Sequence, residues 1–192
     1  MGAGVILLIC LCVLGGVAIA VALYVLSLYN KLKSQEVLVD EAWSGIDVQL
    51  KKRFDLIPNL VETVKGYATQ EKEIFEKVAA LRSGMMNNSA DPEELGKMEG
   101  ELRSTLKTLF AVAENYPELK SNQNFLALQT SLQQIEDELE SARRYYNGAV
   151  RDLNRMIVVF PNSFIAGIFG IKARKFFEIA NAEERENVKV SF

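Results

Sequence analysis

The chain has 192 residues, of which 22 are Lys or Arg, 25 are Asp or Glu and none is His, so its formal net charge is −3. A mildly acidic chain does not fit nucleic-acid binding, which requires a net basic face to neutralise phosphates. The absence of histidine excludes the Glu-x-x-His di-iron sites of helical bundles, His-assisted nucleophiles and zinc proteases. We therefore expect no catalytic residue, no metal site and no cofactor, and we predict that the protein is not an enzyme.

The first thirty residues carry no charged side chain, and the first charge is Lys31. As a helix this stretch would reach about 45 Å, whereas the hydrocarbon core of a bilayer is about 30 Å thick. We predict a transmembrane anchor over residues 1–30, with the span near Val5 to Leu26. The triplet Ala18-Ile19-Ala20 resembles a signal-peptide cleavage site, but no basic region precedes it and the apolar run is too long.

Two further properties of the anchor can be read from the sequence. Lys31 and Lys33 follow the span and no basic residue precedes it, so the positive-inside rule predicts an external N-terminus and a cytoplasmic domain. Small residues spaced four apart can let two membrane helices pack closely. The candidates for such packing are Gly16, Ala18, Ala20 and Ala22.

Beyond the anchor, apolar residues recur with helical spacing and no segment alternates with the period of a strand. We predict an all-α fold, in which the transmembrane helix is followed by an elongated antiparallel four-helix bundle over residues 31–161. The first bundle helix continues out of the membrane and should end before Pro58, which lacks a backbone donor. Asn59 and Glu62 read as a capping box that begins a second helix, predicted to run to about Met85.

The second half of the predicted bundle has clearer boundaries. Residues 86–90 are predicted to form a loop, and the Asp91-Pro92 pair begins a third helix that Pro117 ends. The fourth helix, predicted over residues 122–160, has apolar residues at alternating steps of three and four. That period is typical of packing along a left-handed helix–helix seam.

Residues 162–178 are too short to span a membrane and too apolar for an ordinary solvated tail. Because consecutive helices are antiparallel, the fourth helix should end near the bilayer. Two interpretations stay open: the segment caps the bundle, or it lies in the membrane interface with its cations toward anionic lipid. Contact with another copy is compatible with both. The candidate residues are Phe164, Ile165, Ile168, Phe169, Lys172, Arg174, Lys175, Phe176 and Phe177. Residues 179–192 are predicted to be a mobile tail.

The end of the bundle farthest from the membrane contains a second candidate surface. A basic triplet near the end of the first bundle helix and charges near Pro117 could meet a protein partner. These residues are Lys51, Lys52, Arg53, Glu118 and Lys120. Trp43 lies on the apolar stripe of the first bundle helix and is predicted to belong to the core.

The run from Ala42 to Tyr67, AWSGIDVQLKKRFDLIPNLVETVKGY, is similar to the signature of the bacterial LemA family. Other segments that resemble the family are 114–120, 124–126, 160–162 and 166–167, so that the match covers about residues 30–177. The resemblance implies a bacterial inner-membrane protein with an antiparallel four-helix domain and no catalytic residues. It also implies MamQ-like, magnetosome-associated relatives that are tied to membrane shaping.

Two functions fit these expectations. The first is a self-assembling scaffold whose partners are copies of itself and the lipid bilayer, and which organises or remodels the membrane. The alternative is a membrane-anchored adaptor that presents the helical bundle to another membrane or cytoplasmic protein.

Overall fold

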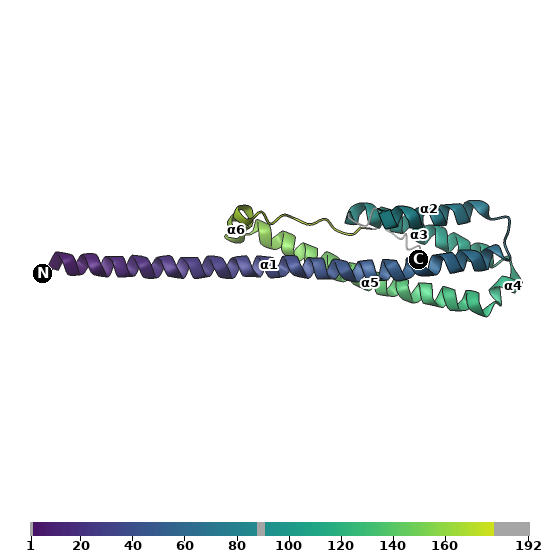
Figure 1. Ribbon diagram of the computed structural model, residues 1–192, viewed down its shortest axis with the longest axis horizontal. Helices are drawn as coiled ribbons and strands as arrows, with labels where there is room; N and C mark the ends of the chain where they lie inside the picture. The colour runs from purple at the N-terminus through teal and green to yellow at the C-terminus, as the bar shows by residue number, and fades with distance from the viewer. Residues whose placement is uncertain (1, 88–90, 179–192) are drawn as a thin grey trace, which may run out of the picture. The chain divides into compact units, whose positions relative to one another are not determined.

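The computed structural model of the chain describes residues 2–87 and 91–178. In this part of the chain the fold is α-helical and contains no strand, which confirms the predicted fold class. The elements are α1 (Gly2–Lys65), α2 (Lys72–Asn87), α3 (Pro92–Ala113), α4 (Pro117–Lys120), α5 (Gln123–Val158) and α6 (Asn162–Phe169) (Figure 1). The four-helix bundle, as a specific arrangement, stays a prediction.

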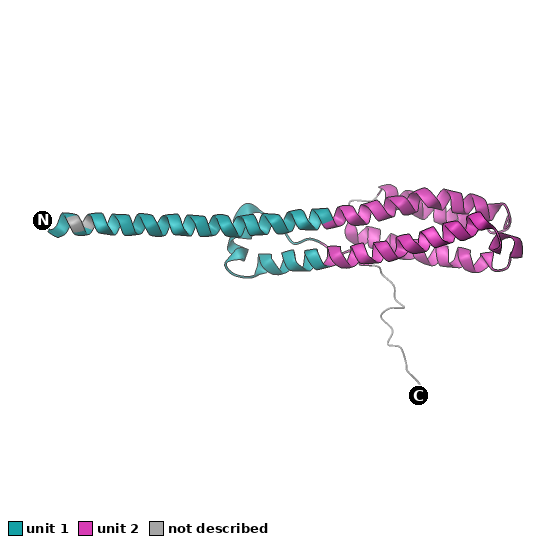
Figure 2. Cartoon of the chain, turned by 90° about the horizontal axis from the view of Figure 1, so that it is seen from below, with its two compact units in different colours: residues 1–41, 148–174 teal, residues 42–147, 175–192 magenta. Residues whose placement is uncertain are grey.

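The chain divides into two compact units, which Figure 2 shows in different colours. Unit 1 consists of Met1–Glu41 and Gly148–Arg174, and unit 2 consists of Ala42–Asn147 and Lys175–Phe192. Each unit has its own buried apolar side chains. Those of unit 1 include Leu32, Val39, Ala149, Val150, Leu153, Ile165, Ala166 and Ile171. Those of unit 2 include Ile46, Leu50, Ile57, Leu60, Met85, Leu95, Leu102, Leu109, Leu119 and Leu139.

Helix α1 continues through Pro58 to Lys65, so the predicted helix end at Pro58 and helix start at Asn59 are wrong. A proline lacks the amide that would donate to the carbonyl four residues earlier, here that of Phe54. In the structure this carbonyl accepts a hydrogen bond of 2.8 Å from Nε of Arg82 on α2. A side chain of another helix thus replaces the missing donor, and α1 continues past the proline.

The end of α2 and the start of α3 lie close to the predicted positions, whereas α2 begins only at Lys72 and α3 already ends at Ala113. Asp91 is the N-cap of α3 as predicted, and its Oδ1 accepts a hydrogen bond of 3.0 Å from the amide of Glu93. Met86 and Asn87 belong to α2 and correct the predicted start of the loop. The rest of that loop, residues 88–90, lies outside the described residues, as does the predicted tail over 179–192.

The connection between α3 and α5 contains the short helix α4, which the sequence did not predict. After it, Asn122 begins α5, because its Oδ1 accepts hydrogen bonds from the amides of Asn124 and Phe125, at 2.9 and 3.1 Å. The predicted start of this helix near Asn122 is therefore confirmed, and its end at Val158 lies close to the predicted end at Phe160.

Candidate membrane interface

The N-terminal part of α1 is long and apolar enough to cross a membrane, and the stretch that qualifies is not buried against the rest of the protein. This observation fits a single-pass membrane anchor. The small residues predicted to permit close packing all lie on this stretch and are exposed: Gly16, Ala18, Ala20 and Ala22. Whether two anchors associate through them stays a prediction.

Helix α6 packs beside the end of this apolar stretch. The rings of Phe169 on α6 and Tyr29 on α1 lie 4.5 Å apart between centroids. Tyr29 stands two positions before Lys31, the first charged residue of the chain. Gly170 ends α6 in the left-handed conformation at a φ of 69°, which a residue without a Cβ adopts at little cost. Contact with Tyr29 therefore places α6 at the boundary between the apolar and the charged parts of α1.

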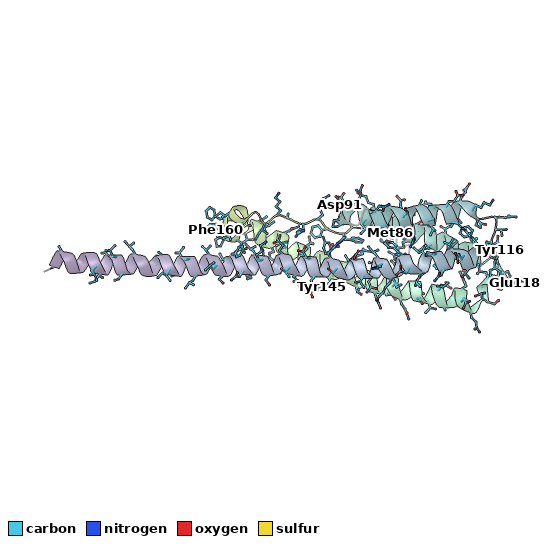
Figure 3. The ribbon with its side chains drawn as sticks, in the orientation of Figure 1. Met86, Asp91, Tyr116, Glu118, Tyr145 and Phe160 are labelled. Carbon is cyan, nitrogen blue, oxygen red and sulfur yellow. The ribbon has the colours of Figure 1, made fainter. Side chains whose placement is uncertain are left out.

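One side of α6 is buried and the other carries exposed apolar side chains. Ile165 and Ala166 are buried, whereas Phe164 is 66% exposed and Ile168 is 61% exposed. The preceding turn adds Phe160, which is 82% exposed and is labelled in Figure 3 beside the end of α5. We call the exposed set the α6 patch: Val158, Val159, Phe160, Phe164, Ile168 and Phe169. Exposed apolar patches of this kind mark interaction sites.

Arg174, one of the candidate interfacial cations, forms ion pairs with carboxylates of unit 1. Its Nη2 lies 3.2 Å from Oδ1 of Asp40 and 3.6 Å from Oε1 of Glu36. Asn154 on α5 holds its backbone, because the Asn154 side chain donates to the Arg174 carbonyl and accepts from the Arg174 amide, both at 2.9 Å. Glu36 also accepts a hydrogen bond of 2.6 Å from Lys33, which raises the pKa of that lysine.

Lys175 is likewise paired, within unit 2. Its Nζ lies 2.7 Å from Oδ2 of Asp91, and this contact raises the pKa of Lys175 and lowers that of Asp91. Phe177 is fully buried, and its ring centroid lies 6.0 Å from that of Trp43. Of the candidate residues over 162–178, Ile165 and Phe177 are buried, whereas Arg174 and Lys175 are exposed but paired with carboxylates. The members that are exposed and form no ion pair in the described part of the chain are Phe164, Ile168, Phe169, Lys172 and Phe176.

Trp43, predicted to belong to the core, is half-buried, and its ring also contacts that of Tyr146 at 5.3 Å between centroids. Sequence reasoning missed the asparagines at 147 and 154, whose side chains bind the backbone of the segment after α6. Their spacing of seven places them on one face of α5, and that is the only sequence signal that points to them.

The predicted distal partner surface is smaller than expected, because Arg53 is buried in unit 2 with only 4% exposure. Its Nη1 lies 2.6 Å from Oε1 of Glu99 and 3.0 Å from Oε2 of Glu136, and Arg103 approaches Glu136 at 3.1 Å. Burial raises the pKa of Glu99 to about 7, and the charge of Arg53 opposes this shift. We call these four charged side chains the ionic cluster of unit 2; Arg53 and Glu99 are buried, whereas Arg103 is 41% exposed and Glu136 is 21% exposed.

The other residues of the distal set remain at the surface. Lys52 forms an exposed ion pair of 3.2 Å with Glu138, and Lys51, Glu118 and Lys120 are exposed. An exposed pair of this kind contributes little to stability. Among residues 2–87 and 91–178, no group of His, Cys, Asp and Glu side chains is arranged to hold a metal ion.

Comparison with known proteins gives a consistent set of relatives. The sequence model of the LemA family matches residues 42–192. Magnetosome proteins MamQ 1 and MamQ 2 of Paramagnetospirillum magneticum are each 27% identical to the chain over 160 residues, which is 70% of this chain and 59% of theirs. Protein LemA of Metamycoplasma hominis is 27% identical over 165 residues, 84% of this chain and 74% of its own. The chain thus spans about three fifths of the length of the MamQ relatives.

Proposed function

Because the chain belongs to the LemA family, we propose that it is a non-enzymatic membrane protein that assembles with copies of itself and organises or remodels the bacterial inner membrane. The observation that carries this proposal is the position of the α6 patch. Contact between Phe169 and Tyr29 holds exposed apolar side chains at the level where the apolar stretch of α1 ends.

The α6 patch would act on the bilayer as an interfacial insertion. Amphipathic segments lie about 5–10 Å deep at the boundary between headgroups and acyl chains, and they add area to one leaflet only. The exposed Phe and Ile side chains of α6 supply the apolar surface for such an insertion, and α1 fixes its depth. By the positive-inside rule, Lys31 and Lys33 assign the insertion to the cytoplasmic leaflet.

A single insertion of this size affects few lipids, so the proposal includes assembly. Many weak membrane contacts within one assembly raise the total avidity by a factor of order 10² or more. The small residues on the exposed surface of α1, such as Gly16 and Ala20, supply a face on which two anchors can approach closely.

The membrane part of the proposal is tested by removing the apolar character of the patch without touching buried residues. The variant Phe164→Ser/Ile168→Ser changes two exposed side chains of α6. Its control, Val48→Ser/Leu126→Ser, changes two exposed apolar side chains of unit 2. Full-length protein is reconstituted into liposomes, and vesicle diameter and shape are measured by cryo-electron microscopy. We expect wild type and control to remodel the vesicles and the α6 variant not to. Vesicles left unchanged by the wild-type protein would overturn the proposal.

Assembly is tested on the same preparations in mild detergent by light scattering coupled to size-exclusion chromatography. We expect oligomers for the wild-type protein, and a lower mass when Ala18→Leu/Ala22→Leu fills the small-residue face. A monomeric wild-type protein that also leaves liposomes unchanged would favour the adaptor function, with Lys51, Glu118 and Lys120 as its exposed distal charges.

A further inference from the structure

We propose that unit 1 selects anionic phospholipids, with Lys31, Arg155 and Lys172 binding the headgroup phosphates next to the α6 patch. This inference rests on the proposed function, because it requires the α6 patch to lie at the bilayer surface. It keeps Lys172 from the candidate cations of residues 162–178 and adds Lys31 and Arg155, because Arg174 and Lys175 pair with carboxylates.

Among the described residues, three cations of unit 1 are paired with carboxylates and three are not. In unit 1, Lys33 pairs with Glu36, Arg151 with Asp152, and Arg174 with Asp40. The cations that remain are exposed and have no acidic partner within the described part of the chain: Lys31, Arg155 and Lys172.

The three remaining cations lie close in sequence to the α6 patch or to its contact with α1. Lys31 stands two residues beyond Tyr29, whose ring contacts α6, and Lys172 stands three residues beyond Phe169, the other partner in that contact. Arg155 lies on α5 four residues before Val159 of the patch, about one helical turn away. Three segments therefore each bring one free cation to the charged side of the same boundary, where phosphate groups lie.

Unit 1 also differs from the whole chain in the sign of its net charge. Unit 1 holds six cations and four carboxylates, a net charge of +2, although the chain as a whole carries −3. Unit 1, which contains the anchor, thus carries a net positive charge, whereas the rest of the chain carries a net charge of −5. A cationic unit at an anionic surface is complementary to it, and the attraction extends over about a Debye length.

The test uses the full-length protein and two matched triple variants. One is Lys31→Gln/Arg155→Gln/Lys172→Gln, and the control is Lys72→Gln/Lys77→Gln/Lys107→Gln, which removes the same charge from exposed positions of unit 2. Each protein is equilibrated in detergent with equal amounts of dioleoylphosphatidylglycerol and dioleoylphosphatidylcholine. Native mass spectrometry then gives the ratio of the two lipids that remain bound.

We expect the wild type and the control to retain phosphatidylglycerol in excess. One cation near an anionic surface corresponds to about a fivefold change in lipid affinity. The ratio of bound phosphatidylglycerol to phosphatidylcholine should therefore be at least about tenfold lower in the unit 1 variant than in the wild type. Equal ratios in the wild type and the unit 1 variant would overturn the inference, as would an equal loss in the control.

A separate measurement distinguishes failure of the headgroup inference from failure of the proposed function. In a Cys10→Ser/Cys12→Ser background, a nitroxide label at Phe164→Cys reports whether α6 lies in lipid, through its accessibility to oxygen and to a water-soluble relaxing agent. A label that lies in lipid together with no lipid preference refutes only the headgroup inference. A label in water refutes both the inference and the interfacial position of α6.

Discussion

The side-chain amide of Asn147 forms two hydrogen bonds with the backbone of Phe177: Nδ2 donates to its carbonyl at 3.0 Å, and Oδ1 accepts from its amide at 2.9 Å. Residues 171–178 form no helix or strand, so their buried backbone groups require hydrogen-bond partners from other segments. One asparagine satisfies both groups of a residue whose side chain is fully buried. Tyr146 adds a hydrogen bond of 2.9 Å from its hydroxyl to the carbonyl of Lys175. Two neighbouring residues of α5 therefore hold this segment in unit 2.

Replacing Asn147 with Ala should release the segment around Phe177. The variant leaves a buried donor and acceptor without partners, which costs about 1–3 kcal/mol of unfolding free energy. Chemical denaturation measures this loss, and hydrogen–deuterium exchange should show faster exchange of the Phe177 amide. Gln134→Ala, which removes an exposed amide from the same helix, is the control and should change neither quantity. Unchanged exchange at Phe177 in the Asn147 variant would contradict the role we assign.

Two glycines should respond to alanine in opposite directions. A Cβ at Gly96 on α3 would lie 2.2 Å from the carbonyl oxygen of Glu178, so the backbone there would have to move. Gly96→Ala should therefore destabilise unit 2 and speed amide exchange around Glu178. A Cβ at Gly45 on α1 meets no atom within 4 Å, and Gly45→Ala should stabilise the helix by about 1 kcal/mol. Chemical denaturation of both variants measures the two changes in unfolding free energy. Stabilisation by Gly96→Ala would show that the backbone around Glu178 can move away from α3 without cost.

The parts of the fold that depend on local chemistry could be predicted from the sequence. Asp91 and Asn122 each accept hydrogen bonds from amides within the next three residues. The capping residue and the helix start that it stabilises are therefore neighbours in the sequence. The course of α1 through Pro58 could not be predicted in this way. Its compensating donor, Arg82, is 24 positions away, and no local pattern connects the two residues.

The candidate interface could be predicted only in part, for a similar reason. The composition of residues 162–178 identifies an apolar and basic segment, but Ile165 and Phe164 differ in exposure only through packing. Which cations are neutralised depends on pairs distant in sequence, such as Arg174 with Asp40, which are 134 positions apart. The sequence identifies the charged residues but does not predict which of them form ion pairs.

The donor role of Arg82 can be tested by restoring the donor that Pro58 removes. Arg82→Ala leaves the Phe54 carbonyl without its partner and should lower the unfolding free energy by about 1–3 kcal/mol. In a Pro58→Ala background, the new backbone amide can donate to that carbonyl, so the same change should cost less. A double-mutant cycle by chemical denaturation should give a coupling of about 1 kcal/mol or more. If the two changes add within about 0.5 kcal/mol, Arg82 does not act as the replacement donor.

The buried Arg53–Glu99 pair of the ionic cluster should make the stability of unit 2 depend on pH. Burial raises the pKa of Glu99 from 4.5 to about 7, although Arg53 stabilises the charged carboxylate. A carboxyl group whose pKa is raised by folding binds its proton more tightly in the folded state. Its contribution to stability is therefore fully present below pH 4.5 and is lost as the pH rises through about 7. The gap between the two pKa values corresponds to about 3 kcal/mol.

The midpoint of thermal unfolding of the full-length protein in detergent should therefore fall between pH 5 and pH 8 at constant ionic strength. Glu99→Gln keeps an oxygen that can accept the hydrogen bond from Arg53 but cannot ionise, so it should flatten this dependence. Glu101→Gln, an exposed change on the same helix, should leave the slope as in the wild type. Circular dichroism of the three proteins across the pH range measures the unfolding midpoints. A slope that survives in Glu99→Gln would assign the pH dependence to other groups, because that variant has lost the buried carboxyl group and its proton.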